Sequence, residues 1–157
     1  MARTAPAGDT QRDDRSNDSR SSDDRSSDDR PSANRASGDR RALGDIGERL
    51  VARYLRYEGA AILERNWCCL EGELDIIARE PDGTVVGVEV KTRRGLSFGE
   101  PIEAVTPAKV ARLRRLLGLW LRDHPEVMAT DLRLDVVGVL IRPGEPVTLR
   151  HLTAVGS

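Results

Sequence analysis

The sequence predicts an α/β fold in which a mixed β-sheet is flanked by helices. Helical and strand-like segments follow one another in the core order αβββαβ, and one further short strand comes last. Because the helices are separated by a β-meander, a mixed sheet is favoured over a fully parallel one. Two of the strand-like segments carry charged residues at positions that a buried strand usually fills with valine, which indicates a functional site.

The amino-terminal part of the chain differs in composition from the rest. Residues 1–41 contain no Ile, Leu, Val, Phe, Tyr or Trp, and the pentad Ser-Ser-Asp-Asp-Arg occurs at 21–25 and again at 26–30. Such a segment cannot bury enough apolar surface to offset the loss of chain entropy. We therefore expect a disordered low-complexity tail over residues 1–41 and one folded domain over residues 42–157. The tail holds nine Arg and nine Asp, which favours a solubilising role.

Composition also limits the class of protein. The formal net charge is −1, so any basic surface for a nucleic acid must be local. No apolar run approaches the roughly 20 residues of a membrane span, and the chain starts without the apolar core of a signal peptide. We therefore expect a cytoplasmic protein with no membrane partner. The only cysteines, Cys68 and Cys69, are adjacent, which suits neither a disulfide nor a zinc site.

The first half of the domain contains one helix and three strands. Apolar residues recur at helical spacing over Leu43–Glu58, and Gly59 follows where a C-terminal cap is expected. Strands are predicted over Ala60–Trp67, Glu73–Arg79 and Thr84–Lys91. A Pro-Asp-Gly turn joins the last two into a hairpin.

The second half contains one helix and two strands. Thr106 followed by proline predicts a helix start, and the helix should run over Pro107–Arg122 with basic residues on its polar faces. Strands are predicted over Leu132–Ile141 and Val147–Leu152, with a Pro-Gly-Glu-Pro turn between them.

Three charged residues, Asp75, Glu89 and Lys91, lie inside the apolar strands of the predicted hairpin. If the turn has an odd number of residues, such as Glu80–Thr84, Asp75 lies directly opposite Glu89, and Glu73 lies opposite Lys91. Directly opposed residues point to the same face, with Cβ atoms roughly 4.5–5.5 Å apart. The sequence therefore predicts that two carboxylates share one pocket.

Such a pocket suits a hard divalent cation, because two neighbouring carboxylates repel unless positive charge lies between them. Mg²⁺, for which Mn²⁺ can substitute, prefers oxygen ligands, so Asp75, Glu89 and the backbone carbonyl of Val90 are candidate metal ligands. Lys91 could orient or deprotonate a metal-bound water that attacks phosphorus, or stabilise the developing charge. The alternative is a purely structural cluster, in which Lys91 and Arg93 neutralise the carboxylates across the hairpin.

These motifs resemble known families. An aspartate, about a dozen residues and then Glu-x-Lys, after a helix that bears a glutamate, look like the PD-(D/E)xK nuclease superfamily with its restriction-endonuclease-like fold. More closely, the chain resembles the YraN family of small bacterial proteins, which is similar in core to archaeal Holliday-junction resolvases. The resemblance covers about Leu43 to Leu152 and rests on Gly44-x-x-Gly47-Glu48, Arg65-Asn66-Trp67, Gly72-Glu73-Leu74-Asp75-Ile76-Ile77-Ala78, Val88-Glu89-Val90-Lys91-Thr92-Arg93, Phe98-Gly99-x-Pro101, Lys109 and Arg133-x-Asp135-Val136-Val137.

The resemblance implies roles for individual residues. It makes Asp75 and Glu89 metal ligands and Lys91 the catalytic lysine. It also makes Glu48 the helix carboxylate that supports the metal or its water, and Lys109 a phosphate contact or a cation that completes the site. An ordinary solvent-exposed helix residue is the alternative for both Glu48 and Lys109.

Gly87 departs from the family pattern, since relatives usually carry a bulky apolar residue at this position. Glycine inside a strand indicates a bulge or a close approach of another part of the chain. A bulge would shift the register and separate Asp75 from Glu89.

Together these features predict a Mg²⁺-dependent endonuclease that hydrolyses phosphodiester bonds, with DNA favoured over RNA. Arg93, Arg94, Lys109 and Arg112 are candidate contacts to the phosphate backbone. Aromatic residues are too scarce to form a stacking platform for single strands, which favours structured or branched DNA. Resolvase-like action would imply a homodimer. The alternative function is a non-catalytic nucleic-acid-binding or docking module that keeps the fold.

Overall fold

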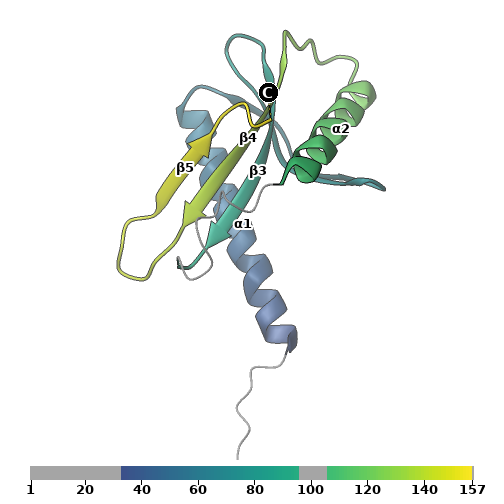
Figure 1. The fold of residues 1–157 in the computed structure, drawn as a ribbon. Coiled ribbons are helices and arrows are strands. Elements are labelled where there is room, and N and C mark those ends of the chain that lie inside the picture. Colours follow the sequence, from purple (N-terminus) through teal and green to yellow (C-terminus); the bar gives the residue numbers. More distant parts are fainter. Residues whose placement is uncertain (1–32, 96–105, 157) are drawn as a thin grey trace, which may run out of the picture. The chain divides into compact units, whose positions relative to one another are not determined.

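A computed structural model describes residues 33–95 and 106–156. Its elements are α1 (Ala33–Tyr57), β1 (Ala61–Cys69), β2 (Gly72–Arg79), β3 (Val85–Arg93), α2 (Pro107–Asp123), β4 (Leu132–Leu140) and β5 (Thr148–Leu152). Figure 1 shows these elements in the order that the sequence predicts, and each strand begins and ends within two residues of its prediction. Most of the predicted tail, residues 1–32, lies outside the described residues.

The five strands form one mixed sheet with the order β1-β2-β3-β4-β5. β3 and β4 are parallel, and the other neighbouring strands are antiparallel. Helix α2 makes the crossover between β3 and β4, as a parallel pair requires. The hydroxyl of Thr106 accepts a hydrogen bond from the backbone N–H of Lys109, so the predicted cap of α2 is confirmed.

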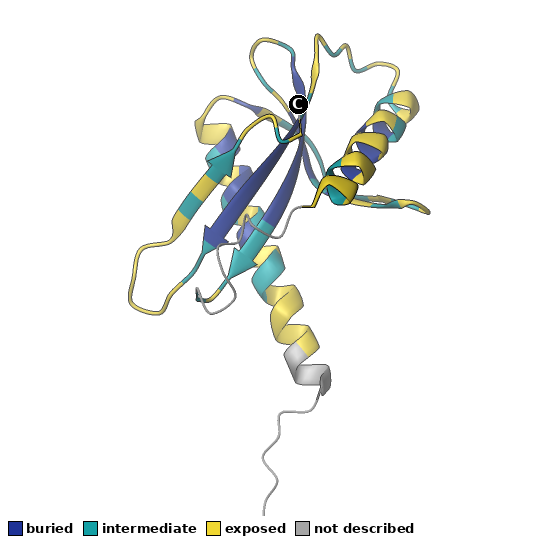
Figure 2. Cartoon of the chain, viewed as in Figure 1, coloured by how far each residue is buried: buried dark blue, intermediate teal, exposed yellow. Residues whose placement is uncertain are grey.

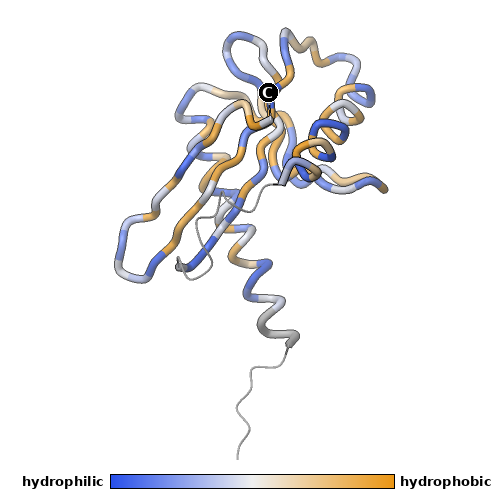
Figure 3. The backbone as a smooth tube through the Cα atoms, viewed as in Figure 1, coloured by the Kyte–Doolittle hydropathy of each residue, from blue (hydrophilic) through white to orange (hydrophobic). Residues whose placement is uncertain are grey.

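Each helix packs against the sheet through a separate cluster of apolar side chains. Val51 and Leu55 of α1 pack with Val88 and other side chains of β2, β3 and β4, whereas Leu117 and Trp120 of α2 pack in a second cluster. Figure 2 shows β3 and β4 buried along most of their length, and Figure 3 shows that these strands are largely hydrophobic. No helix among residues 33–95 and 106–156 is long and apolar enough to cross a membrane.

Helix α1 begins at Ala33, ten residues before its predicted start at Leu43. The apolar periodicity marks only the part that packs on the sheet. The preceding residues, 37–42, are exposed and include Arg and Ala, which are strong helix formers without any apolar face. The early turns of α1 therefore extend past the sheet, as Figure 1 shows.

Gly87 does not mark a bulge. β2 and β3 pair without a register shift, from Arg79 opposite Val85 to Ile77 opposite Gly87. A Cβ atom on Gly87 would lie 3.0 Å from Cδ2 of Leu134 and 3.4 Å from Cδ2 of Leu117, so the glycine accommodates the close packing of α2 on the sheet.

Candidate functional site

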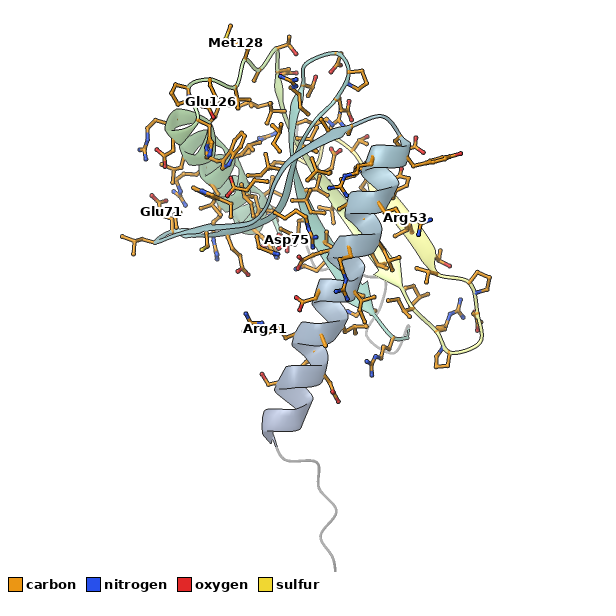
Figure 4. All side chains as sticks on the ribbon, turned by 180° about the vertical axis from the view of Figure 1, so that it is seen from behind. Arg41, Arg53, Glu71, Asp75, Glu126 and Met128 are labelled. Atoms are coloured by element: carbon orange, nitrogen blue, oxygen red, sulfur yellow. The ribbon has the colours of Figure 1, made fainter. Side chains whose placement is uncertain are left out.

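Strands β2 and β3 separate where the charged residues begin. The last pair between them is Ile76 with Val88, which is the register that a five-residue turn predicts. Beyond this pair, β2 stays with β1 as far as Gly72, and β3 stays with β4. Figure 4 shows Glu71 at the tip of the projecting β1–β2 hairpin and Asp75 near its base. We call the gap between the two strands the fork.

At the fork, the side chain of Asp75 accepts a hydrogen bond from a backbone N–H that would otherwise pair with the neighbouring strand. Its Oδ2 atom accepts a hydrogen bond of 2.7 Å from the backbone N–H of Val90. The backbone carbonyl of a strand residue faces the same side as its N–H, so the Val90 carbonyl also faces the fork. The register places Glu89 across from Asp75, as predicted, but the paired ladder ends one residue earlier.

Glu89 holds two lysines at once. Its side chain is 7% exposed, and its Oε1 atom accepts hydrogen bonds from the Nζ atoms of both Lys91 and Lys109. These are the only lysines in the chain, which contains 23 arginines. An ammonium group is a compact point charge, whereas a guanidinium is a wide planar fork, so two lysines can share one oxygen where two arginines would crowd.

The fork contains a cavity of about 330 Å³. Its lining residues are the acidic Glu48, Glu73, Asp75 and Glu89, the basic Lys91, Lys109 and Arg112, and Gly44, Val90 and Leu113. The structure thus brings together all four residues predicted to be catalytic, the Val90 backbone and two of the four predicted nucleic-acid contacts. Arg93 and Arg94 follow in the chain but do not line this cavity.

Two glycines allow the helices to reach the fork. A Cβ atom on Gly47 would lie 1.8 Å from Oγ1 of Thr92, so α1 packs directly on the end of β3 and presents Glu48 to the cavity. On the other side, a Cβ atom on Gly72 would lie 2.3 Å from Nη2 of Arg112. Both glycines belong to the motifs that the sequence singles out. Close packing against Thr92 explains Gly47, whereas a positive φ of 147° explains Gly72.

The charges at the fork are not balanced within the site. Burial, together with the nearby carboxylates of Glu89 and Glu48, raises the pKa of Asp75 to about 7, although the hydrogen bond from the Val90 N–H and the charge of Lys91 act in the opposite direction. Burial alone would lower the pKa of Lys91, but its hydrogen bond to Glu89 holds that pKa above its usual value. Lys91 is therefore a protonated donor in this state, which favours charge stabilisation over proton abstraction.

The donor set fits a hard divalent cation that keeps water ligands. In the two described stretches, 33–95 and 106–156, no three His, Cys, Asp or Glu side chains come together closely enough to hold a metal by themselves. The available protein ligands are the carboxylates of Asp75 and Glu89 and the Val90 carbonyl. This is the number of protein ligands that Mg²⁺ typically accepts alongside water and substrate phosphate.

A second charged cluster surrounds Asp135 of β4, which is 1% exposed. Its Oδ1 atom accepts hydrogen bonds of 2.9 Å from Nε of Arg133 and from the N–H of Ala154, and its Oδ2 atom lies 2.9 Å from Nη2 of Arg133 and 3.0 Å from Nε2 of His151. Arg133 also pairs with Glu80. Burial would raise the pKa of Asp135, but the hydrogen bonds from His151 and Arg133 lower it overall.

The candidate site lies within the part of the chain that matches a known protein family. A family model described as "Uncharacterised protein family UPF0102" matches residues 47–139, which include every candidate site residue. A UPF0102 protein of Nocardia farcinica is 52% identical over 117 residues, which cover 74% of this chain and 91% of the relative. A UPF0102 protein of Kineococcus radiotolerans is 50% identical over 114 residues, which cover 73% of this chain and 93% of the relative.

Proposed function

The chain belongs to the uncharacterised protein family UPF0102, which is the YraN family, and we propose that it is a divalent-metal-dependent endonuclease with a restriction-endonuclease-like core. One observation carries this proposal. Asp75, Glu89 and Lys91 converge from two strands on a single cavity at the point where those strands separate. Glu89 is buried and Asp75 is half-buried, and carboxylates that face one another beside a lysine suit metal-assisted phosphodiester hydrolysis.

Each residue at the fork has a role in this proposal. Asp75, Glu89 and the Val90 carbonyl would hold Mg²⁺ or Mn²⁺, which when bound supplies a Lewis acid and lowers the pKa of a water ligand. The ammonium of Lys91 would stabilise negative charge on the phosphate oxygens, and Glu48 would orient water beside the site. Structured or branched DNA is the proposed substrate, and a homodimer would supply the two sites that resolvase-like cutting needs.

Lys109 and Arg112, on the first turns of α2, lie beside these residues at the fork. Both line the cavity, and each carries a positive charge that a phosphate group of the substrate could take as its partner. We assign them to substrate positioning, with Lys109 also holding Glu89 in place.

One observation favours a second candidate function. Two ammonium groups already neutralise Oε1 of Glu89, which is the arrangement of a structural ion-pair cluster. In that case the chain would bind nucleic acid, or dock on a partner, without cutting.

Cleavage assays distinguish the two functions. Labelled duplex, junction, flap and single-stranded DNA are incubated with Mg²⁺ or Mn²⁺, using the wild type, Asp75→Asn and Lys91→Ala. Asp123→Asn, at the far end of α2, is the matched control, because Asp123 is exposed and, among the described residues, pairs with its neighbour Arg122. We expect metal-dependent cutting that falls about 1000-fold in both site variants and is unchanged in the control. A wild type that binds DNA but never cuts in either metal, with variants that bind alike, would favour the binding module.

A further inference from the structure

A larger hollow of about 890 Å³ adjoins the fork cavity. Its lining residues are Arg41, Gly44, Asp45, Glu48 and Arg49 of α1, Arg65, Asn66 and Cys68 of β1, and Glu73 of β2. Gly44, Glu48 and Glu73 line both spaces, so one leads into the other. We propose that this hollow, the arginine groove, binds the sugar–phosphate backbone of the DNA strand beside the phosphate held at the fork. The inference rests on the proposed function and extends it to a substrate-binding surface.

Arginines from two different elements line the arginine groove. Arg41 and Arg49 come from α1, eight residues apart and therefore on one face of the helix, and Arg65 comes from β1. Figure 4 shows Arg41 on the side of α1 where Asp75 lies, whereas Arg53 lies on the opposite side. Each guanidinium presents several donors in a planar array that matches phosphate oxygens.

Among the described residues, Arg65 is the groove arginine with an unsatisfied buried donor. Arg65 has only a long contact to Glu48, at 3.5 Å, and its Nε atom is buried without a hydrogen-bond partner there. A buried donor without a partner is costly, so an oxygen-rich ligand would be stabilised at this position. In contrast, Arg115 and Arg122 of α2 already pair with Glu71 and Asp123.

Asn66 lines the groove and has an unusual backbone conformation. Its φ angle of 55° is left-handed, and Ala154 is the only other described residue besides glycine with a positive φ. The pairs on either side, Arg65 with Ile76 and Trp67 with Leu74, put Asn66 opposite Asp75. Asparagine tolerates this conformation, and unusual backbone angles concentrate at ligand sites. Arg65 and Asn66 of the Arg65-Asn66-Trp67 motif therefore line the groove on the strand that pairs with Asp75.

The charge of the groove suits a polyanion when a divalent cation is bound at the fork. Three arginines face three acidic residues, but two of these, Glu48 and Glu73, also face the fork. A divalent cation at the fork would offset their charge, which leaves the outer part of the groove basic. The groove should then bind phosphates more tightly with a cation than without one.

The test measures DNA binding as a function of salt. Fluorescence anisotropy of a labelled duplex and of one of its single strands is recorded in EDTA and in Ca²⁺, for the wild type, Arg41→Ala, Arg49→Ala and Arg65→Ala. Arg53→Ala is the matched control, because Arg53 is exposed on the same helix but outside the groove. We expect each groove variant to weaken binding about threefold to tenfold. Each lost phosphate contact should also reduce the slope of log K against log salt by about 0.9 for duplex or 0.7 for single strand.

The outcomes separate this inference from the nuclease proposal. If the wild type binds and the groove variants keep its affinity and salt slope, the groove is wrong even if the protein cuts DNA. A wild type that binds no DNA also overturns the groove. If the groove variants lose affinity and slope while the wild type never cuts, the groove is correct and only the nuclease proposal fails. Because Arg41 and Arg49 are exposed, their replacement should leave the fold intact.

Discussion

Two aspartates on the same sheet, the buried Asp135 and the half-buried Asp75, are held in opposite ways. Asp135 has four donor atoms around its two oxygens, and its pKa is lowered. Asp75 accepts from one backbone N–H, and its pKa is raised to about 7. Burial of a carboxylate therefore does not by itself indicate function. An aspartate whose oxygens are fully hydrogen-bonded stabilises the fold. An aspartate with few donors, beside other carboxylates, is where a bound cation would release the greatest free energy.

The largest expected effect is on stability, at Asp135. Asp135→Asn removes the buried charge that pairs with the half-buried Arg133 and should lower the free energy of unfolding by about 3–5 kcal/mol, because the four donors around this carboxylate lose a charged acceptor. Urea denaturation measures this change. Asp123→Asn, at an exposed ion pair, should stay within about 0.5 kcal/mol of the wild type. A loss at Asp135 below about 1 kcal/mol would remove the contrast between the two aspartates.

The next largest expected effect is a gain in the free energy of unfolding, and its size depends on pH. The folded-state pKa of Asp75 lies above its unfolded value of about 4, so the metal-free fold binds more protons and loses stability as pH rises from about 4 to about 7. Asp75→Asn removes this loss and should be more stable than the wild type by about 2 kcal/mol above pH ~7, with no difference near pH ~4. Asp135 acts in the other direction, since its contribution is present above pH ~4 and lost only as pH falls further.

Unfolding curves at several pH values, in the presence of EDTA, measure this difference. Asp123→Asn again serves as the control, and its curve should follow that of the wild type across the range. A difference between wild type and Asp75→Asn that grows toward low pH would show that the fork is not the strained carboxylate site described above.

A smaller change in the free energy of unfolding is expected when Mg²⁺ binds. At a Mg²⁺ concentration about ten times its Kd, binding to the folded state should stabilise the wild type by about 1.4 kcal/mol, and Asp75→Asn should gain nothing. Thermal unfolding with Mg²⁺, against a potassium salt of equal ionic strength, measures the shift. Equal gains in both proteins would mean that Mg²⁺ acts elsewhere on the chain.

The smallest effect on stability is expected at Lys109. Lys109→Arg keeps the charge, so the free energy of unfolding should change by less than about 0.5 kcal/mol. The wider guanidinium cannot share Oε1 of Glu89 with Lys91 in the same way, so cutting should slow about tenfold. Arg115→Lys, an exposed exchange on the same helix, is the control. Unchanged cutting would show that Lys109 contributes only its charge.

Much of this arrangement could be predicted because alternation along strands is strict. The apolar pattern and the Pro-Asp-Gly turn set both the strand limits and the register, so Asp75, Glu89 and Lys91 were expected in one pocket. Gly87 was ambiguous, since a glycine in a strand is compatible with both a bulge and a close contact. Only the positions of Leu117 and Leu134 decide between them.

Other features leave no trace in local sequence patterns. The early turns of α1 have no apolar face, and the left-handed Asn66 lies inside a run that reads as an ordinary strand. The donors around Asp135 come from separate segments, up to Ala154, so no spacing rule reveals them. Lys109 could have been assigned to the site from composition alone, because a chain that uses arginine almost everywhere keeps lysine at only two positions.

The same scarcity makes the fork chemically distinctive. Reagents that acylate primary amines modify lysine but not arginine side chains, and both lysine side chains of this protein lie within one ion-pair cluster. At alkaline pH, where these ammonium groups lose their protons, an acylating agent would label the amino terminus and this cluster, and mass spectrometry of the Lys91 and Lys109 peptides would report occupancy of the fork. Ligands that bind there should protect both lysines together, which offers a screen that requires no knowledge of the substrate.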